Sequence, residues 1–587
     1  MNQNLRNLTH KSELCVVGGG LSGICAAVAA ARRGIRVVLM HDRAMLGGNA
    51  SSEVRMWVCG AHGRNNRETG ILEEIALENY YRNPYRVWPI WDNILYELVK
   101  KEPNITLLLN CSCNDAQVEG KRVRTISGWQ GTSQTWHTVE AKYFADCSGD
   151  SILAPLTGAE YRVGREARGE FGESIAPEKA DAKTMGNSCL IQAREMSEKR
   201  TFIAPEQIRS FRKEELVNRQ PHPNISLENF WFLELGGEQD TIHDAEEIRD
   251  ELIQAAYGMW DYVKNSGNCS ADNWELDFVG YLPGKRESRR YVGDYIMTQN
   301  DVRAEGRFDD LIAYGGWTMD DHNPAGLNTT EQPTIYHPAP SPFGIPYRCV
   351  YSKNIENLFF AGRNISVTHS AMSATRVMAT CGLLGQAVGT AASIAARHDI
   401  TPREVYTKHI KELQQMLMED DCYLPFHRME MSELTRSARI MTDGENAKAL
   451  VDGVDRPIGE ESHMWKGREG NSIVFAFRKN EYVREIRFVF DSDLNRETVC
   501  EDGFRADKST LSNVPMNYKP VCVPKTLVKA LKVEVLENGD WIEIPGISDN
   551  HKRLVKLPVN RLTEGIRVTL TQTWGNEQVG IQSIDLR

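Results

Sequence analysis

The chain has 587 residues, a formal net charge of −11 and a sequence pI of about 5.8, and it contains no basic run of the kind that marks a nucleic-acid-binding protein. Its longest apolar stretches stop short of the roughly 20 residues that a membrane span requires. Because its first residues also lack an apolar signal core, we expect a cytoplasmic protein without a membrane span.

Residues 14–43 form the most informative segment of the chain. An apolar strand leads into the run Gly18–Gly23 (GGGLSG), which is followed by an alanine-rich helix and by a second strand, 37–40. In such a run the first glycine permits a tight turn, the second lets the backbone approach a pyrophosphate, and the third allows close packing of helix and strand. The helix N-terminus then attracts the phosphates. The segment therefore predicts a dinucleotide site.

The end of the second strand bears on which dinucleotide binds. An acidic residue at this point normally accepts hydrogen bonds from the ribose hydroxyls. Here the chain reads His41-Asp42-Arg43, so Asp42 is the expected ribose ligand, with His41 as the alternative occupant of the strand end. The loop that follows carries the pair Gly47-Gly48 and then Asn49. A flavin needs such a loop more than a nicotinamide does.

Together with three later segments, these features resemble the large family of FAD-dependent oxidoreductases with a glutathione-reductase-like fold and a Leu-Gly-Gly-Asn loop. The three segments are 144–150 (FADCSGD), 284–294 (GKRESRRYVGD) and 357–390, which includes NLFFAGRN and SATRVMATCGLLGQAVGT. The resemblance spans residues 12–400 and implies FAD as the cofactor. The cofactor-binding residues that we expect are Gly18, Gly20, Ser22, Gly23, Asp42, Arg43, Gly47, Gly48, Asn49, Ser148, Gly149, Gly362, Arg363 and Gly385.

One position departs from the family pattern. Where related flavoproteins carry a Gly-Asp pair beside the ribityl chain, this chain has Gly362-Arg363. Two alternatives follow: Arg363 turns to a cofactor phosphate, for which its paired donors suit an anion, or Asn364 takes over the ribityl contact. The small-residue helix 373–396 is expected to be buried, and the resemblance points its start toward the flavin ring, where the helix dipole stabilises negative charge.

Three residues are candidates for catalysis. His369 lies between the Gly362 turn and the small-residue helix, and a neutral histidine suits general base work near pH 7; the alternative is a histidine that only hydrogen-bonds its loop. Arg376 is a candidate for holding an anionic group or reduced flavin, or else it pairs with a carboxylate. His62 is expected to line the pocket.

The substrate class is the least constrained inference. An arginine group beside Glu287 either clamps a carboxylate substrate or forms salt bridges; it consists of Arg286, Arg289 and Arg290. Four tryptophans either stack on sugar faces or belong to the core; they are Trp57, Trp88, Trp91 and Trp317. The thirteen cysteines include no CxxC pair, so we expect reduced structural thiols and no metal site, Cys59 and His62 having no second ligand pair. No second glycine fingerprint for a nicotinamide is present.

The predicted fold class is α/β: a discontinuous Rossmann-like FAD-binding domain with an inserted α+β substrate domain, followed by an all-β jelly-roll sandwich. The last part is predicted from short alternating strands and resembles galactose-binding or discoidin-like domains. The predicted boundaries are 1–165 and 346–400 for the FAD-binding domain, 166–345 for the substrate domain, 401–430 for a helical connector and 431–587 for the β domain.

These features favour an FAD-dependent oxidoreductase that oxidises a secondary hydroxyl of a carbohydrate or glycoside, with His369 or His62 taking the proton. The first alternative is oxidation or reduction of a carbon–carbon bond in a carboxylic acid. The second alternative is a flavin-containing glycan-binding protein. The expected partner is a small-molecule substrate, and the sequence leaves the electron acceptor and homo-oligomerisation open.

Overall fold

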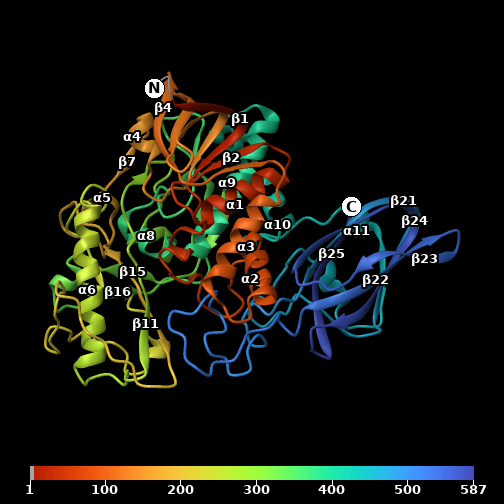
Figure 1. The fold of residues 1–587 in the computed structure, drawn as a ribbon. Coiled ribbons are helices and arrows are strands. Elements are labelled where there is room, and N and C mark those ends of the chain that lie inside the picture. The colour runs from red at the N-terminus through yellow and green to blue at the C-terminus, as the bar shows by residue number, and fades with distance from the viewer. Residues whose placement is uncertain (1–4) are drawn as a thin grey trace. The chain divides into compact units, whose positions relative to one another are not determined.

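The computed structural model describes residues 5–587 and divides into two compact units, each described here by itself (Figure 1). Unit 1 contains the residues up to His62 together with Val87–Leu413 and Lys508–Tyr518. Unit 2 contains Gly63–Arg86, Gln414–Asp507 and Lys519–Arg587.

The centre of unit 1 is a seven-stranded sheet with the order β3-β2-β1-β6-β5-β4, in which β18 also pairs with β6. Its strands are β1 (Arg6–Val17), β2 (Val37–Met40), β3 (Ile105–Leu108), β4 (Cys111–Glu119), β5 (Arg122–Gln130), β6 (Thr135–Asp146) and β18 (Leu358–Phe360). The pairs β3·β2, β2·β1, β1·β6 and β6·β18 are parallel, whereas β4·β5 and β5·β6 are antiparallel. The all-apolar, fully buried strand β2 is typical of a parallel sheet that is covered on both faces. The predicted α/β class is confirmed, with a mixed sheet whose central strands are parallel.

Small residues allow two helices to approach closely in unit 1. A Cβ atom on Gly385 would lie 2.0 Å from the carbonyl oxygen of Ser22, and one on Gly389 would lie 2.1 Å from that of Ala26. The helices are α1 (Leu21–Arg32) and α9 (Met378–His398). Unit 1 also contains α3 (Trp88–Lys100), α4 (Leu153–Thr157) and α8 (His369–Thr375). Among the described residues α9 is the one helix long and apolar enough to cross a membrane, but its apolar window is 94% buried inside the protein. Burial against α1 accounts for its composition.

The segment between β6 and β18 supplies short strands and one long helix, α6. Leu252, Met259 and Trp260 on the apolar face of α6 are buried in one hydrophobic core. Its elements are β7 (Tyr161–Arg162), α5 (Arg168–Phe171), β8 (Asn187–Ser188), β9 (Ile191–Glu195), η2 (Ile225–Leu227), β10 (Glu234–Leu235), α6 (Ala245–Asn265), β11 (Trp274–Val279), β12 (Gly284–Lys285), β13 (Arg290–Tyr291), α7 (Gln299–Arg303), β14 (Leu311–Gly315), β15 (Met319–His322), η3 (Gly326–Asn328), β16 (Thr334–His337), β17 (Phe343–Pro346) and η4 (Tyr347–Cys349). These strands form small antiparallel sheets, which agrees with the α+β composition expected for this segment.

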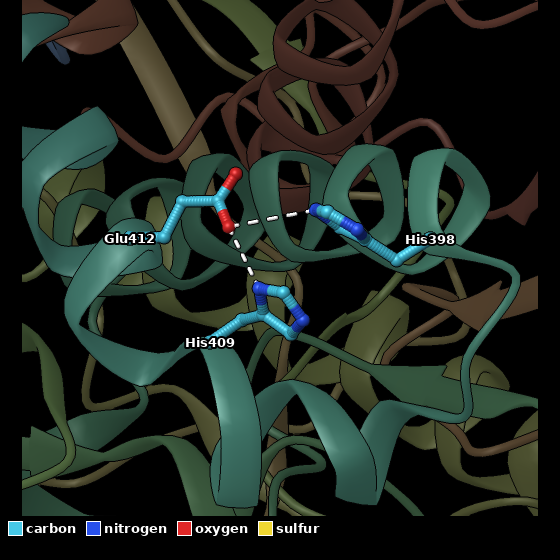
Figure 2. Close-up of side chains that lie close together, drawn as sticks. All are labelled: His398, His409 and Glu412. Carbon is cyan, nitrogen blue, oxygen red and sulfur yellow. Dashed lines mark hydrogen bonds and ion pairs between the residues drawn. The ribbon is translucent and has the colours of Figure 1, made fainter.

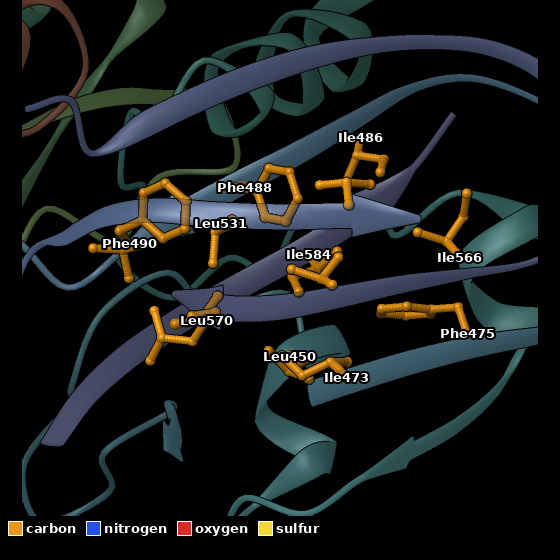
Figure 3. Packing of buried hydrophobic residues seen from close by; sticks show 14 of the residues in the cluster. Leu450, Ile473, Phe475, Ile486, Phe488, Phe490, Leu531, Ile566, Leu570 and Ile584 are labelled. Carbon is orange, nitrogen blue, oxygen red and sulfur yellow. The ribbon is translucent and has the colours of Figure 1, made fainter. Parts of the chain in front are cut away.

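Unit 2 is built on an antiparallel sheet with the order β20-β25-β21-β24-β22-β23, to which β19 adds beside β21. Its elements are β19 (Arg439–Thr442), η5 (Ala447–Val451), β20 (Trp465–Arg468), β21 (Ser472–Phe490), β22 (Val528–Glu537), β23 (Asp540–Ile547), β24 (Leu554–Thr573), β25 (Gln578–Leu586) and the helices α2 (Ile71–Arg82) and α11 (Glu433–Ser437). Figure 3 shows side chains from several of its strands, among them Phe475, Phe488 and Leu531, meeting in one apolar core. The predicted all-β domain is confirmed as an antiparallel sheet, while its jelly-roll topology stays a prediction.

Two segments belong to units other than those that the predicted boundaries give them. Residues 63–86 group with unit 2, because Glu73 on α2 forms a buried ion pair with Arg496 at 2.5 Å. Residues 508–518 group with unit 1, where the Asn513 side chain accepts the Ala193 N–H at 2.8 Å. Helix α10 (Pro402–Glu419) begins in unit 1 and ends in unit 2. Contacts between residues distant in sequence decide these assignments, and no local composition shift marks them.

Candidate FAD and substrate site

The glycine run between β1 and α1 has the steric properties of a dinucleotide turn. Gly18 has a φ of +104°, and a Cβ there would lie 2.4 Å from the carbonyl oxygen of Cys147. A Cβ on Gly23 would lie 1.8 Å from the carbonyl oxygen of Gly18. At Gly20, in contrast, the nearest heavy atom would be 3.9 Å away. The turn is thus closed on the protein side and open at the glycine expected to face the pyrophosphate.

The Leu-Gly-Gly-Asn loop docks directly on this turn. The Gly47 N–H donates to the carbonyl oxygen of Gly19 at 2.8 Å, and a Cβ on Gly48 would lie 3.1 Å from the Cα of Gly20. Asn49 donates from Nδ2 to the carbonyl oxygen of Lys285 at 3.1 Å. The loop therefore joins the glycine turn to strand β12 of the inserted segment.

The two candidates at the end of β2 have separate roles in the structure. His41 is buried, its Nδ1 accepts the Gly19 N–H at 3.0 Å, and its Nε2 faces the carbonyl oxygen of Met45 at 2.9 Å. The Asp42 side chain is 62% exposed. His41 thus braces the glycine turn, and Asp42 presents a carboxylate at the strand end, where the ribose contact is predicted.

Arg363 has a partner that neither sequence-based alternative included. Its Nη2 lies 2.7 Å from Oδ1 of Asp150, whose Oδ2 lies 2.8 Å from Lys285 Nζ, while the Ser288 hydroxyl donates to the same carboxylate. Burial favours the protonated acid, but Arg363 and Lys285 outweigh it and lower the pKa of Asp150 to about 2. The Arg363 side chain also lies over Gly149, where a Cβ would meet Nη1 at 2.7 Å. In this structure the guanidinium neutralises a protein carboxylate.

Both predicted serine ligands have hydrogen bonds inside the protein. Ser22 donates to the carbonyl oxygen of Ala361 at 3.2 Å, and Ser148 donates to Oδ1 of Asp146 at 2.7 Å. Gly362 has a φ of +117°, and a Cβ there would lie 3.1 Å from the Ser22 hydroxyl. Ser22 therefore ties the glycine turn to the backbone after β18, and Ser148 binds the carboxylate at the end of β6.

Several buried polar atoms in this region have no hydrogen-bond partner among the described residues. Both side-chain amide atoms of Asn187 are in this state, as are Oδ1 of Asn364 and Nε of Arg363. Asn187 pairs in register with Lys285, whose carbonyl accepts from Asn49. Because an unsatisfied buried polar group costs about 1–3 kcal/mol, these atoms suit a bound polar ligand. Together with the open glycine turn, they fit FAD.

His369 lies in a charged network next to this region. Its Nδ1 is 2.8 Å from Oε2 of Glu287, its Nε2 is 3.1 Å from Oδ1 of Asp321, and its backbone N–H donates to Glu166. Burial would lower the pKa of His369, but Glu287 and Asp321 outweigh it and raise the pKa to about 10. Arg290 lies in the same network and pairs with Glu166 at 2.9 Å. These contacts favour a charged His369 ring at neutral pH rather than the expected neutral base, and its catalytic role stays a prediction.

Arg376 belongs to a second charged group, carried mainly by β15. Its Nη2 lies 3.1 Å from Oδ2 of Asp320, which also contacts His322 Nε2 at 3.1 Å. His322 Nδ1 is 2.6 Å from Glu234, and Glu234 is 3.5 Å from Arg286. Arg376 thus pairs with a carboxylate, the alternative that the sequence left open. The run Asp320-Asp321-His322 was the sequence signal for both networks, and the sequence analysis missed it.

His62 differs from both buried histidines. Its ring stacks on Trp317 with a centroid distance of 4.1 Å and an interplanar angle of 23°. Its backbone N–H donates to the carbonyl oxygen of Gly316 at 3.0 Å. Burial, with a further effect of Lys508, lowers the pKa of His62 below its ordinary value. The structure therefore presents a neutral imidazole on a partly exposed tryptophan.

The loop that carries His62 lies against the start of α9. The Ala379 N–H in the first turn of that helix donates to the carbonyl oxygen of Cys59 at 2.9 Å. Six residues further along, about 9 Å at the usual rise per residue, Gly385 contacts Ser22 of the glycine turn. One helix thus connects the His62 loop with the predicted cofactor turn.

The four tryptophans singled out in the sequence fall into two groups. Trp57, Trp88 and Trp91 are buried, and Trp91 donates from Nε1 to the carbonyl oxygen of Ala50 at 2.6 Å. Trp317 is partly exposed. The arginines of the 284–294 segment are engaged as well: Arg290 with Glu166, Arg286 with Glu234 and Arg289 over the ring of Tyr161. Three tryptophans are core residues, and the arginines form intramolecular contacts.

The sequence profile of the family described as FAD dependent oxidoreductase matches residues 13–417. No curated protein sequence matches the chain significantly. Among solved structures, p-nitrophenol 4-monooxygenase PnpA from Pseudomonas putida has 12% identity and a TM-score of 0.30, with 71% of this chain and 91% of that chain covered.

Two carbohydrate-binding modules also match in part. The family 32 module of Streptococcus pneumoniae EndoD has 12% identity and a TM-score of 0.20, covering 27% of this chain and 99% of that chain. The family 32 module of C. perfringens NanJ, solved in complex with galactose, has 10% identity and a TM-score of 0.19, covering 27% and 97%. The profile match covers most of the chain and contains the glycine turn, the Leu-Gly-Gly-Asn loop and the α9 segment. This chain belongs to the FAD dependent oxidoreductase family.

Proposed function

We propose that this enzyme oxidises a secondary hydroxyl group of a carbohydrate or glycoside, and that His62 accepts the hydroxyl proton. The observation that carries the proposal is the stack of His62 on Trp317, with ring centroids 4.1 Å apart. It joins the base required for alcohol oxidation to an aromatic face of the kind that binds the C–H face of a sugar.

The proposed oxidation needs an alcohol substrate, an acceptor for the hydride and a base for the proton. The alcohol carbon loses a hydride and its oxygen loses a proton, leaving a ketone. FAD, when bound, supplies the two-electron acceptor for the hydride. The glycine turn, Asp42 and the Asn49 loop would hold FAD, and His62 takes the proton at a ring nitrogen. Because its pKa is lowered, the imidazole is neutral and ready to accept that proton at pH 7.

The charged contacts of His369 favour His62 as the residue that accepts the hydroxyl proton. Both ring nitrogens of His369 face carboxylates, and its pKa of about 10 keeps the ring protonated at neutral pH. A protonated ring accepts no further proton. Its charge instead balances the carboxylates of Glu287 and Asp321.

The arginines give less support to a carboxylic acid substrate. Arg290 is 1% exposed and pairs with Glu166, and Arg286 and Arg376 pair with Glu234 and Asp320. A substrate carboxylate would have to replace one of these buried acids. Replacement leaves a buried charge without its partner, which costs several kcal/mol.

An anaerobic spectral screen tests this proposal. FAD-loaded protein is mixed with sugars, glycosides, hydroxy acids and unsaturated acids, and bleaching of the flavin band near roughly 450 nm is followed. Bleaching by a sugar or glycoside supports the proposal. Bleaching by acids alone overturns the substrate class, and an unbleached flavin combined with glycan binding favours the binding-protein alternative.

The proton acceptor is tested with two histidine variants. We expect His62→Gln to slow flavin reduction by about 10²–10⁴-fold with FAD retained. His243→Gln is the matched control, since His243 is exposed and pairs only locally with Asp240 at 2.8 Å. Equal reduction rates in His62→Gln and the control would exclude His62 as the base.

A further inference from the structure

We propose that His398, His409 and Glu412 form a binding site for one divalent transition-metal ion, with Zn²⁺ as the best match. His398 is the last residue of α9, and His409 and Glu412 lie three residues apart on α10, so they share one helix face. Figure 2 shows both histidine rings turned toward the same carboxylate oxygen. The three ligand atoms lie within 4.8 Å of one another.

The distances are close to those of a tetrahedral site. Glu412 Oε2 lies 3.6 Å from Nε2 of His398 and 2.8 Å from Nδ1 of His409. With zinc–ligand bonds of about 2.0–2.2 Å, neighbouring ligand atoms are separated by about 3.4 Å. The His398 distance already fits, and the His409 distance has to open by about 0.6 Å, a small side-chain rotation on an accessible helix.

Two further contacts hold the ligand side chains close together. The two rings stack with centroids 4.1 Å apart and 28° between their planes. Arg397 Nη1 donates to the other carboxylate oxygen, Oε1 of Glu412, at 2.9 Å. Such an outer contact fixes the orientation of a ligating carboxylate and leaves Oε2 facing the rings.

The chemistry of the donors selects the ion. Two imidazoles and one carboxylate suit zinc and similar transition metals, whereas calcium and magnesium prefer sites built from oxygen atoms. The three side chains are 37%, 22% and 33% exposed for His398, His409 and Glu412, so water can complete the coordination. The C-terminal end of α9 also favours a cation. The positive charge of Arg397 opposes binding, so we expect weaker affinity than at a closed structural zinc site.

A bound ion would join the end of α9 to α10. Helix α9 is the element that packs against α1 at the glycine turn and begins beside the His62 loop. The ion would therefore act as a clip at the far end of a helix that positions the site, and this inference stands whatever the substrate is.

The test uses the full-length FAD-loaded protein in two measurements. Zn²⁺ is titrated by calorimetry, and thermal unfolding is followed by circular dichroism with Zn²⁺ and then with excess EDTA. We expect one Zn²⁺ per chain and a higher Tm that EDTA reverses, because a ligand that binds only the folded state stabilises it. Mg²⁺ is expected to give neither effect.

Substitution of the two histidines tests whether Zn²⁺ binds at this site. His398→Gln and His409→Gln should each weaken Zn²⁺ binding at least 10-fold, while His243→Gln keeps it. All three residues are at least partly exposed, and the unfolding curve without metal verifies that each variant is folded. The proposal is overturned if wild-type protein takes up no Zn²⁺, or if His398→Gln and His409→Gln bind as tightly as the control.

Discussion

The imidazole Nδ1 of His369 lies 2.8 Å from Oε2 of Glu287, a carboxylate that is fully buried. Asp321 faces the opposite ring nitrogen at 3.1 Å. One imidazolium thus balances two acids inside unit 1. This relationship favours a charged His369 ring over a neutral one and makes the ring a source of pH-dependent stability.

Replacement of His369 should destabilise unit 1 strongly. His369→Gln removes the cation that lies between Glu287 and Asp321, so that Glu287 keeps only its ion pair with Arg290 at 3.3 Å. Loss of one partner from a buried ion pair costs about 3–5 kcal/mol. The measurement is urea unfolding at pH 6.5, with His243→Gln as the control expected to change stability by less than about 0.5 kcal/mol. A loss no larger than that of the control would contradict the ion-pair assignment.

The same contact predicts how stability changes with pH. The folded-state pKa of His369 is raised to about 10 from an ordinary 6.5. Its contribution is fully present below pH 6.5 and is lost as the pH rises through the folded value. The stability difference between wild type and His369→Gln should therefore narrow from pH 6.5 to 9.5. A difference that is constant over this range would refute the linkage.

The activity profile should report His62. Because burial and Lys508 lower the pKa of His62, its ring becomes protonated only at a pH below the ordinary 6.5. Activity is lost as the pH falls through the lowered value, so the acid limb of kcat/KM should lie below pH 6.5. In His62→Gln this limb should disappear. Its persistence with an unchanged midpoint would assign the titration to another group.

Gly23 should be essential for cofactor binding. A Cβ there would lie 1.8 Å from the Gly18 carbonyl oxygen, so Gly23→Ala has to displace the turn that approaches the pyrophosphate. We expect purified Gly23→Ala to lack the flavin absorption of wild type. Gly169→Ala is the control, since nothing lies within 4 Å of its Cβ and its φ is ordinary. Full FAD content in Gly23→Ala would show that the turn tolerates the shift.

The β core of unit 2 should respond to truncation of a single aromatic side chain. Phe488 is fully buried and stacks on Phe490 with centroids 5.6 Å apart (Figure 3). Phe488→Ala should lower the free energy of unfolding of this unit by about 3–5 kcal/mol. Leu562→Ala, at a side chain that is 57% exposed, should change it by less than about 0.5 kcal/mol. Chemical denaturation monitored by circular dichroism makes the comparison.

The sequence by itself determined the elements whose causes are local. The run Gly18–Gly23 predicts a strand, a turn and a helix because each glycine has a steric reason within a few residues. The small-residue segment of α9 predicts a buried helix for a similar reason, and the alternating strands after residue 431 predict an antiparallel β domain. The family follows from these segments, since their order and spacing are written in the chain.

Only the tertiary structure decided the charges and partners. Glu287 and Asp321 are 34 positions apart in the sequence, and no periodicity indicates that both face His369. Arg363 meets Asp150 across more than 200 residues, a partner that neither alternative from the sequence included. The grouping of 63–86 and 508–518 likewise depends on Glu73 and Asn513 meeting distant residues. A protonation state depends on burial and on neighbouring charges, and both arise only when distant segments of the chain pack together.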